Sequence, residues 1–90
     1  PHIDPRETRR VMILRMRSVP ALDITALNSL ARLWKECQRH RVQLILSHVN
    51  EQPRHVMEKD GFMELVGKEN FCANITEALN RAEEIVRTAK

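Results

Sequence analysis

Two short segments carry the polar side chains that could do chemistry in this chain. Each follows an apolar segment of strand-like composition. Because the carboxyl ends of neighbouring parallel strands meet at one edge of a sheet, we expect the two segments to lie together. The candidate residues of this edge are Ser18, Asp23, Thr25, Ser47, His48 and Asn50. Hydroxyl and amide groups beside helix N-termini suit an anion or a nucleotide phosphate.

A structural role explains two of these residues more simply. Asp23 and Asn50 each precede a segment of helical pattern, where a side-chain oxygen accepts backbone N–H bonds and caps the helix. The Asp23 carboxylate would also repel an anion at this edge. We therefore favour capping over anion binding, and a protein partner that docks here needs neither a phosphate nor catalysis.

No catalytic or metal-binding motif accompanies these residues. The four histidines have neither the helical spacing nor the cysteine partners of a zinc site. With only Gly61 and Gly67, a phosphate-cradling glycine loop is not expected. Cys37 and Cys72 form no C-x-x-C pair, and Cys37 is interpreted as a buried thiol. The sequence thus predicts no catalytic residue, no metal ligand and no cofactor.

The composition indicates one small domain with an aliphatic core. The 90 residues are 42% hydrophobic but only 3% aromatic. The net charge is +3, and the basic residues are scattered without an aromatic stacking platform, which argues against nucleic acid as a partner. No apolar run reaches the roughly 20 residues of a membrane span, and the N-terminus does not resemble a signal peptide. We expect the chain itself to be soluble and cytosolic.

The first half of the chain predicts a strand, a helix and a second strand. Residues 11–17 and 42–46 are predicted strands. Residues 11–14 are apolar without alternation, as in a strand covered on both faces, and residues 42–46 are rich in branched side chains. Arg15 and Arg17 alternate with Met16, so the end of the first strand is expected to reach solvent on one side. Between the two strands, residues 23–40 carry apolar side chains at the 3.6-residue period of a helix that covers one face of the sheet. A unit of this size requires the two strands to be parallel neighbours.

The second half continues the alternation. A short helix with Pro53 near its start is predicted to end at Gly61, which supplies a left-handed residue. Residues 62–66 are predicted to be a third strand on the far side of the second. Asn74 and Glu77 have the spacing of a capping box at the start of the last helix. The predicted fold is α/β, in the order β-α-β-α-β-α, with a mainly parallel sheet.

This order of elements resembles the STAS domain, a family named for sulfate transporters and anti-sigma factor antagonists. The resemblance covers residues 11 to about 82 and rests on five pieces, namely Val19-Pro20-x-x-Asp23, Leu44-Ile45-Leu46-Ser47, Gln52-Pro53, Lys59-Asp60-Gly61-Phe62 and Asn74-Ile75-x-x-Ala78-Leu79. Within the family, the chain looks most like the domain at the cytoplasmic C-terminus of bacterial SulP anion permeases. The pieces typical of that branch are Ile13-Leu14-Arg15-Met16, Val19-Pro20, Gln52-Pro53 and Gly67-Lys68-Glu69-Asn70.

The resemblance implies a non-catalytic regulatory and interaction module of a SulP-type transporter of sulfate-like inorganic anions. Such a module lies on the cytoplasmic face of the inner or plasma membrane. Its implied partners are the transmembrane domain of the same transporter and other cytosolic regulatory proteins, with homo-oligomers formed through the full-length transporter. The transported anion crosses through the membrane part, so its identity is not encoded here.

The turn before the first helix distinguishes this branch from the soluble members of the family. Their turn reads Asp-Ser-Ser-Gly, and a partner kinase phosphorylates its first serine. Here the turn reads Asp23-Ile24-Thr25-Ala26. Ile24 takes the position of that serine and has no hydroxyl, so phosphorylation is not expected there. A soluble anti-sigma antagonist-like switch and a weak nucleotide-binding domain are the alternative functions.

The same turn is apolar and is predicted to contact a partner. Its apolar side chains are Val19, Pro20, Leu22 and Ile24. Apolar residues that gather at a surface turn usually mark a contact. The alternative is that Ile24 packs under the helix N-terminus as part of the core.

The family's domain usually begins with a further strand and a helix ahead of the first strand found here. Residues 1–10 carry two prolines and mostly charged side chains, so we interpret them as a connecting segment, and residues 11–90 as the C-terminal part of a single STAS domain. A sheet of three strands leaves an unpaired edge. We therefore expect strand 11–17 to pair with a strand from outside this numbering, on another fragment or a neighbouring molecule.

Overall fold

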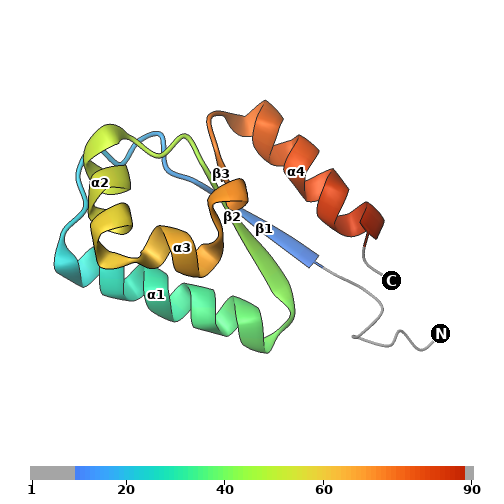
Figure 1. Ribbon diagram of the computed structural model, residues 1–90, viewed down its shortest axis with the longest axis horizontal. Coiled ribbons are helices and arrows are strands. Elements are labelled where there is room, and N and C mark those ends of the chain that lie inside the picture. The colour runs from blue at the N-terminus through green and yellow to red at the C-terminus, as the bar shows by residue number, and fades with distance from the viewer. Residues whose placement is uncertain (1–9, 89–90) are drawn as a thin grey trace.

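A computed structural model describes residues 10–88 of the chain (Figure 1). The elements, in chain order, are β1 (Arg10–Arg15), α1 (Ile24–Arg39), β2 (Val42–Ser47), α2 (Glu51–Asp60), α3 (Phe62–Val66), the 3-10 turn η1 (Lys68–Asn70), β3 (Phe71–Cys72) and α4 (Ile75–Thr88). The sheet lies between α1, α2 and α3 on one face and α4 on the other. The predicted connecting segment lies outside the described residues except for Arg10, which begins β1.

The sheet is parallel throughout, in the order β1-β2-β3. Its register pairs Arg10 with Val42 at one end and Arg15 with Ser47 at the other. The prediction of adjacent parallel strands joined by a helix is confirmed, as is the position of a third strand beyond the second. β1 is shorter than predicted and ends at Arg15, two residues before the expected end.

The prediction that residues 62–66 form the third strand is wrong. They form α3, and the third strand is the two-residue Phe71–Cys72. Gly61, with φ 90°, ends α2 in the left-handed conformation, and a new helix follows at once. Phe62 and Val66 then lie one helical turn apart and are both buried. A run of five residues with four apolar side chains is too short to distinguish the two-residue period of a strand from the 3.6-residue period of a helix, and the packing of Phe62 and Val66 decides for the helix.

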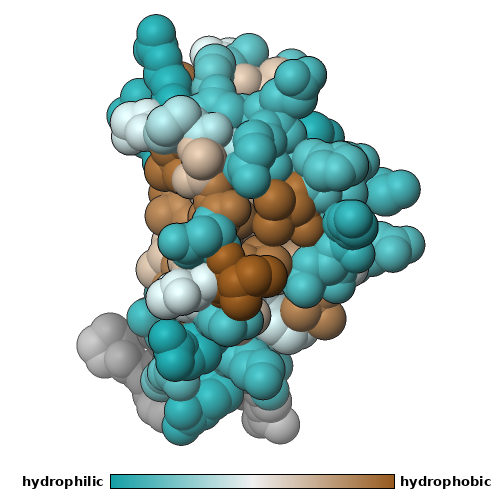
Figure 2. Space-filling view, turned by 90° about the vertical axis from the view of Figure 1, so that its left-hand side faces the viewer, coloured by the Kyte–Doolittle hydropathy of each residue, from teal (hydrophilic) through white to brown (hydrophobic). Residues whose placement is uncertain are grey.

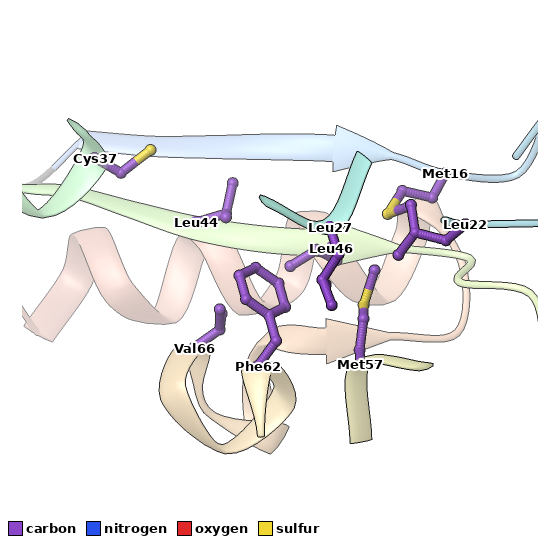
Figure 3. Close-up of a cluster of buried hydrophobic side chains, with 9 residues drawn as sticks. All are labelled: Met16, Leu22, Leu27, Cys37, Leu44, Leu46, Met57, Phe62 and Val66. Atoms are coloured by element: carbon purple, nitrogen blue, oxygen red, sulfur yellow. The ribbon is translucent and has the colours of Figure 1, made fainter. Parts of the chain in front are cut away.

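The core is divided between the two faces of the sheet because neighbouring side chains of β2 point in opposite directions. Leu44 and Leu46 face α1, α2 and α3, whereas Ile45 faces α4, and all three are fully buried. Figure 3 shows the larger cluster, in which side chains from the first three helices converge on β2. Its members are Met16, Leu22, Leu27, Cys37, Leu44, Leu46, Met57, Phe62 and Val66.

Two helix starts follow the predicted capping chemistry. Asp23 Oδ1 accepts a hydrogen bond of 2.8 Å from the backbone N–H of Ala26, which caps α1. At α4, Asn74 Oδ1 accepts a bond of 2.9 Å from the Glu77 backbone, and the Glu77 carboxylate accepts one of 3.1 Å from the N–H of Ala73. Both caps come from residues within four positions of each other, which explains why the local sequence predicts them.

Candidate functional site

The candidate site is the end of the molecule where the carboxyl ends of β1 and β2 meet, at the left in Figure 1. The long connection from β1 to α1 crosses this end, and α1 and α2 both begin here. The connection starts with a turn in which the N–H of Val19 donates to the carbonyl of Met16 at 3.0 Å. Its shape depends on side chains that follow β2.

Asn50 holds the first part of this connection. Its Nδ2 donates to the carbonyl oxygens of Val19 at 2.8 Å and Arg17 at 3.0 Å, and lies 3.5 Å from that of Met16. Asn50 occupies the N-cap position of α2, but its side chain makes no cap bond. The predicted capping role is therefore wrong for its side chain, because the amide is used across the site instead.

Gln52 holds the second part, a role that the sequence analysis missed. Its Oε1 accepts a bond of 2.7 Å from the N–H of Leu22, and its Nε2 donates to the carbonyl of Leu22 at 3.3 Å. This pair of bonds satisfies both backbone groups of one residue, as a neighbouring strand would. Leu22 is thereby held in place with its side chain in the core. The only signal in the sequence was the amide in the Gln52-Pro53 helix start.

The residues after β2 are divided between the interior and the surface. Ser47 is buried with 2% of its surface exposed, and its carbonyl accepts a bond of 2.9 Å from the N–H of Met16. His48 has a left-handed backbone with φ 55°, and its N–H donates to the carbonyl of Cys72 at 2.9 Å. The His48 side chain is exposed.

The arrangement leaves few of the predicted polar residues available to bind an anion. The structure brings the predicted residues to one end, but Asp23 and Asn50 already bond to backbone groups and Ser47 is buried. Ser18, Thr25 and His48 are the predicted polar residues whose side chains are exposed without such a role. Within residues 10–88, no group of three or more His, Cys, Asp or Glu side chains is placed to hold a metal ion.

The apolar side chains of the connection, and that of Ile24 at the start of α1, are also divided between the interior and the surface. Leu22 is buried with 6% of its surface exposed, whereas Ile24 is 67% exposed. Val19 packs partly against the core, and Pro20 is exposed. Figure 2 views this end and shows apolar side chains gathered in its middle, with polar side chains around them. We refer to Val19, Pro20 and Ile24 as the apolar turn.

Neither cysteine has the environment of a nucleophile. Burial raises the pKa of the Cys37 thiol, and the carboxylate of Glu36 raises it further. Burial likewise raises the pKa of the Cys72 thiol, with the carboxylate of Glu77 as the next contribution. The two thiols lie in the clusters on opposite faces of the sheet. Since the thiolate is the reactive form, these surroundings favour inert structural side chains.

The described elements define a small α/β domain with a parallel sheet covered by helices on both faces. The sequence model of the STAS domain matches residues 3–78, and the chain belongs to the STAS domain family. The predicted family and fold are therefore confirmed. Within residues 10–88, no helix combines the length and the apolar composition that crossing a bilayer requires.

Proteins similar to this chain are named as sulfate transporters. Sulfate transporter 4.1, chloroplastic, of Arabidopsis thaliana is 30% identical over 78 residues, which are 87% of this chain and 11% of that protein. A probable sulfate permease of Schizosaccharomyces pombe is 34% identical over 74 residues, and the match covers 74% of this chain and 11% of that protein. The chain thus spans about a tenth of the length of these relatives.

A solved structure has the same fold. The crystal structure of a sulfate transporter family protein from Wolinella succinogenes superposes with a TM-score of 0.83 at 34% sequence identity. The match covers 88% of this chain and 65% of that one.

Proposed function

We propose that this domain is a non-catalytic regulatory and interaction module of a SulP-type inorganic anion transporter, on the cytoplasmic face of the membrane. The observation that carries the proposal is the similarity to sulfate transporters over 87% of this chain but 11% of the relative. A module of that size accompanies a much larger transport machinery. The transmembrane domain of the same protein is the proposed main partner.

The apolar turn is the proposed contact with that partner. Covering an exposed isoleucine contributes about 2 kcal/mol to an interface, and 67% of Ile24 is open to water. Asn50 and Gln52 already hold the backbone of the connection through their amides. A surface ordered before binding loses little conformational entropy when its partner arrives.

The position of Ile24 in the first turn of α1 also bears on the soluble-switch alternative. At the family's serine position this chain presents an exposed aliphatic side chain that accepts no phosphate. A permanent apolar surface supports constant attachment to a partner. A regulatory cycle of phosphorylation would instead need a hydroxyl at this position.

The open edge of β1 is a second proposed contact. Within the described residues β1 pairs only with β2, and Met12 is 40% exposed. We propose that a strand from outside these residues pairs with this edge and completes the domain, of which residues 11–90 are the C-terminal part. Antiparallel pairing of β1 with a second copy, in a register centred on the strand, would place Arg10 opposite Arg15. Since like charges opposite each other are destabilising, the geometry favours a different strand.

Replacing Ile24 by aspartate in the full-length protein tests the proposed contact. We expect transport to fall several-fold because a carboxylate cannot enter an apolar interface. The stability of the 90-residue chain should change by less than about 0.5 kcal/mol, since the site is exposed and an acidic residue is tolerated in the first turn of a helix.

Leu65→Asp is the matched control, because Leu65 is also an exposed aliphatic residue, at 51%, but lies on α3. Its transport should resemble that of the parent. Equal losses for Ile24→Asp and Leu65→Asp, or a large loss of stability in the isolated Ile24→Asp chain, would contradict a specific contact at the apolar turn.

A further inference from the structure

Charge is unevenly distributed between the two halves of the domain. Residues 10–41 contain seven lysines and arginines against two acidic residues, a net charge of +5. Residues 42–88 contain five against eight, a net charge of −3. The positive half comprises β1 and α1. In the negative half, α2 and α3 lie on the same face of the sheet as α1, and α4 lies on the opposite face. The excess of positive charge therefore belongs to β1, α1 and the connections beside them.

Three cations lie in a row on the outer face of α1. Arg32, Lys35 and Arg39 are spaced i, i+3 and i+7, so they share one face of the helix and span about 10 Å along it. All three side chains are exposed, whereas Leu27 and Cys37 on the inner face are buried. We refer to Arg32, Lys35 and Arg39 as the basic strip.

Most of the charge of the strip is not neutralised within the described residues. Arg32 donates only to the Ser29 hydroxyl, at 3.4 Å, and Lys35 forms no ion pair there. Arg39 lies 2.7 Å from the Glu36 carboxylate, in a pair exposed to water on both sides. Exposed pairs of this kind contribute little and yield readily to another anion. The strip therefore presents at least two free cations.

We propose that the basic strip docks on an anionic phospholipid surface, with the three cations over the lipid phosphates. A flat membrane suits a straight row of flexible cations on a rigid helix, because Lys and Arg place their charges at the level of the headgroups. Trp34, the single tryptophan, packs against the core, so the strip has no aromatic side chain on which a nucleic-acid base could stack.

The strip continues from the proposed transporter contact. The apolar turn lies at the N-terminal end of α1, and the strip occupies the C-terminal half of the same helix. A domain attached to the transporter through the apolar turn can lie with α1 along the neighbouring lipid headgroups and with α4 on the side away from the membrane. The position at a membrane rests on the proposed function, but affinity for anionic lipid is a property of this chain alone.

The test uses the purified 90-residue chain and lipid vesicles. We expect it to sediment at low ionic strength with phosphatidylcholine vesicles that contain about a third phosphatidylserine, and to be released as salt screens the charges. Pure phosphatidylcholine vesicles should bind it at least tenfold more weakly. The double variant Arg32→Gln/Lys35→Gln should bind the anionic vesicles about 25-fold more weakly, because each lost cation reduces the affinity about fivefold.

The matched control is Lys59→Gln/Lys68→Gln, which removes the same charge from exposed positions in the negative half. Its affinity should stay within about twofold of the parent, and both double variants should unfold at the parent's temperature. Absent binding at low salt, equal binding to neutral vesicles, or equal losses in both variants would overturn the proposal. Because transport is not measured, these results are independent of the Ile24→Asp experiment.

Discussion

At the scale of single residues, the site depends on side-chain amides that form hydrogen bonds with backbone groups, as a neighbouring strand would do in a sheet. The Asn50 amide reaches the carbonyls of Arg17 and Val19, which precede it by 33 and 31 positions. These carbonyls lie in an irregular connection, where the backbone has no ladder partner of its own. The Asn50 side chain therefore orders the first part of the connection that leads to Ile24.

We predict that Asn50→Ala lowers the free energy of unfolding by about 1–2 kcal/mol, because it removes one part-buried hydrogen bond, to the Val19 carbonyl, and one exposed bond, to the Arg17 carbonyl. Urea denaturation of the chain measures this. Asn28→Ala is the control, since Asn28 is exposed on α1 and alanine is the better helix former. It should be neutral or slightly stabilising. A neutral Asn50→Ala would show that water replaces the amide.

At the scale of elements, one buried asparagine joins the end of α3 to α4. Asn70 Nδ2 donates to the carbonyl of Val66 at 2.9 Å, and its Oδ1 accepts a bond of 2.9 Å from Arg81 Nε. Gly67, with φ 106°, ends α3 so that the chain can turn back toward the sheet. A Cβ at Gly67 would lie 3.0 Å from Asn70 Nδ2. The glycine and the asparagine thus form one structural unit.

Asn70→Ala should destabilise the chain by about 2–3 kcal/mol, because it leaves the Val66 carbonyl and the half-buried Arg81 without this partner. Thermal or urea unfolding provides the measurement. Asn80→Ala, at an exposed position of α4, is the comparison and should change stability by less than about 0.5 kcal/mol. If the two substitutions cost the same, the bridge between α3 and α4 is not a source of stability.

At the scale of the whole molecule, apolar surface continues beyond the open edge of the sheet. Leu79 and Val86 are each 56% exposed and lie seven residues apart on α4. Arg81, on another side of the same helix, bonds to Asn70 in η1. The helical spacing therefore turns Leu79 and Val86 away from the η1 side, toward the side of β1. The open edge of β1 and the exposed side of α4 together form a surface on which one additional strand could pair with β1 and cover Leu79 and Val86.

We predict that the amides of β1 exchange with deuterium faster in the 90-residue chain than in the full-length protein, where the proposed additional strand protects them. Mass spectrometry of peptides covering residues 10–15 gives the comparison. Peptides covering β2 serve as the internal control, because this central strand is paired on both sides in the chain. Equal protection of β1 in a monomeric chain and in the full-length protein would rule out strand addition.

The sequence by itself determined the features that depend on neighbouring residues. The 3.6-residue period located α1, the apolar runs located β1 and β2, and the Asp23 and Asn74 caps used partners three positions away. The order of these pieces was also sufficient to identify the STAS domain family. Such features depend on interactions within a turn or two of the chain, and any local segment displays them.

Only the tertiary structure decided what depends on distant partners. The run at 62–66 is helical because its buried side chains meet a core built by other elements, and β3 is left to the two residues that reach β2. The amides of Asn50 and Gln52 bond across 30 or more positions, and Ile24 is exposed while Leu22 is buried. Local pattern cannot encode these outcomes, because they depend on where the packing of the whole chain brings each side chain.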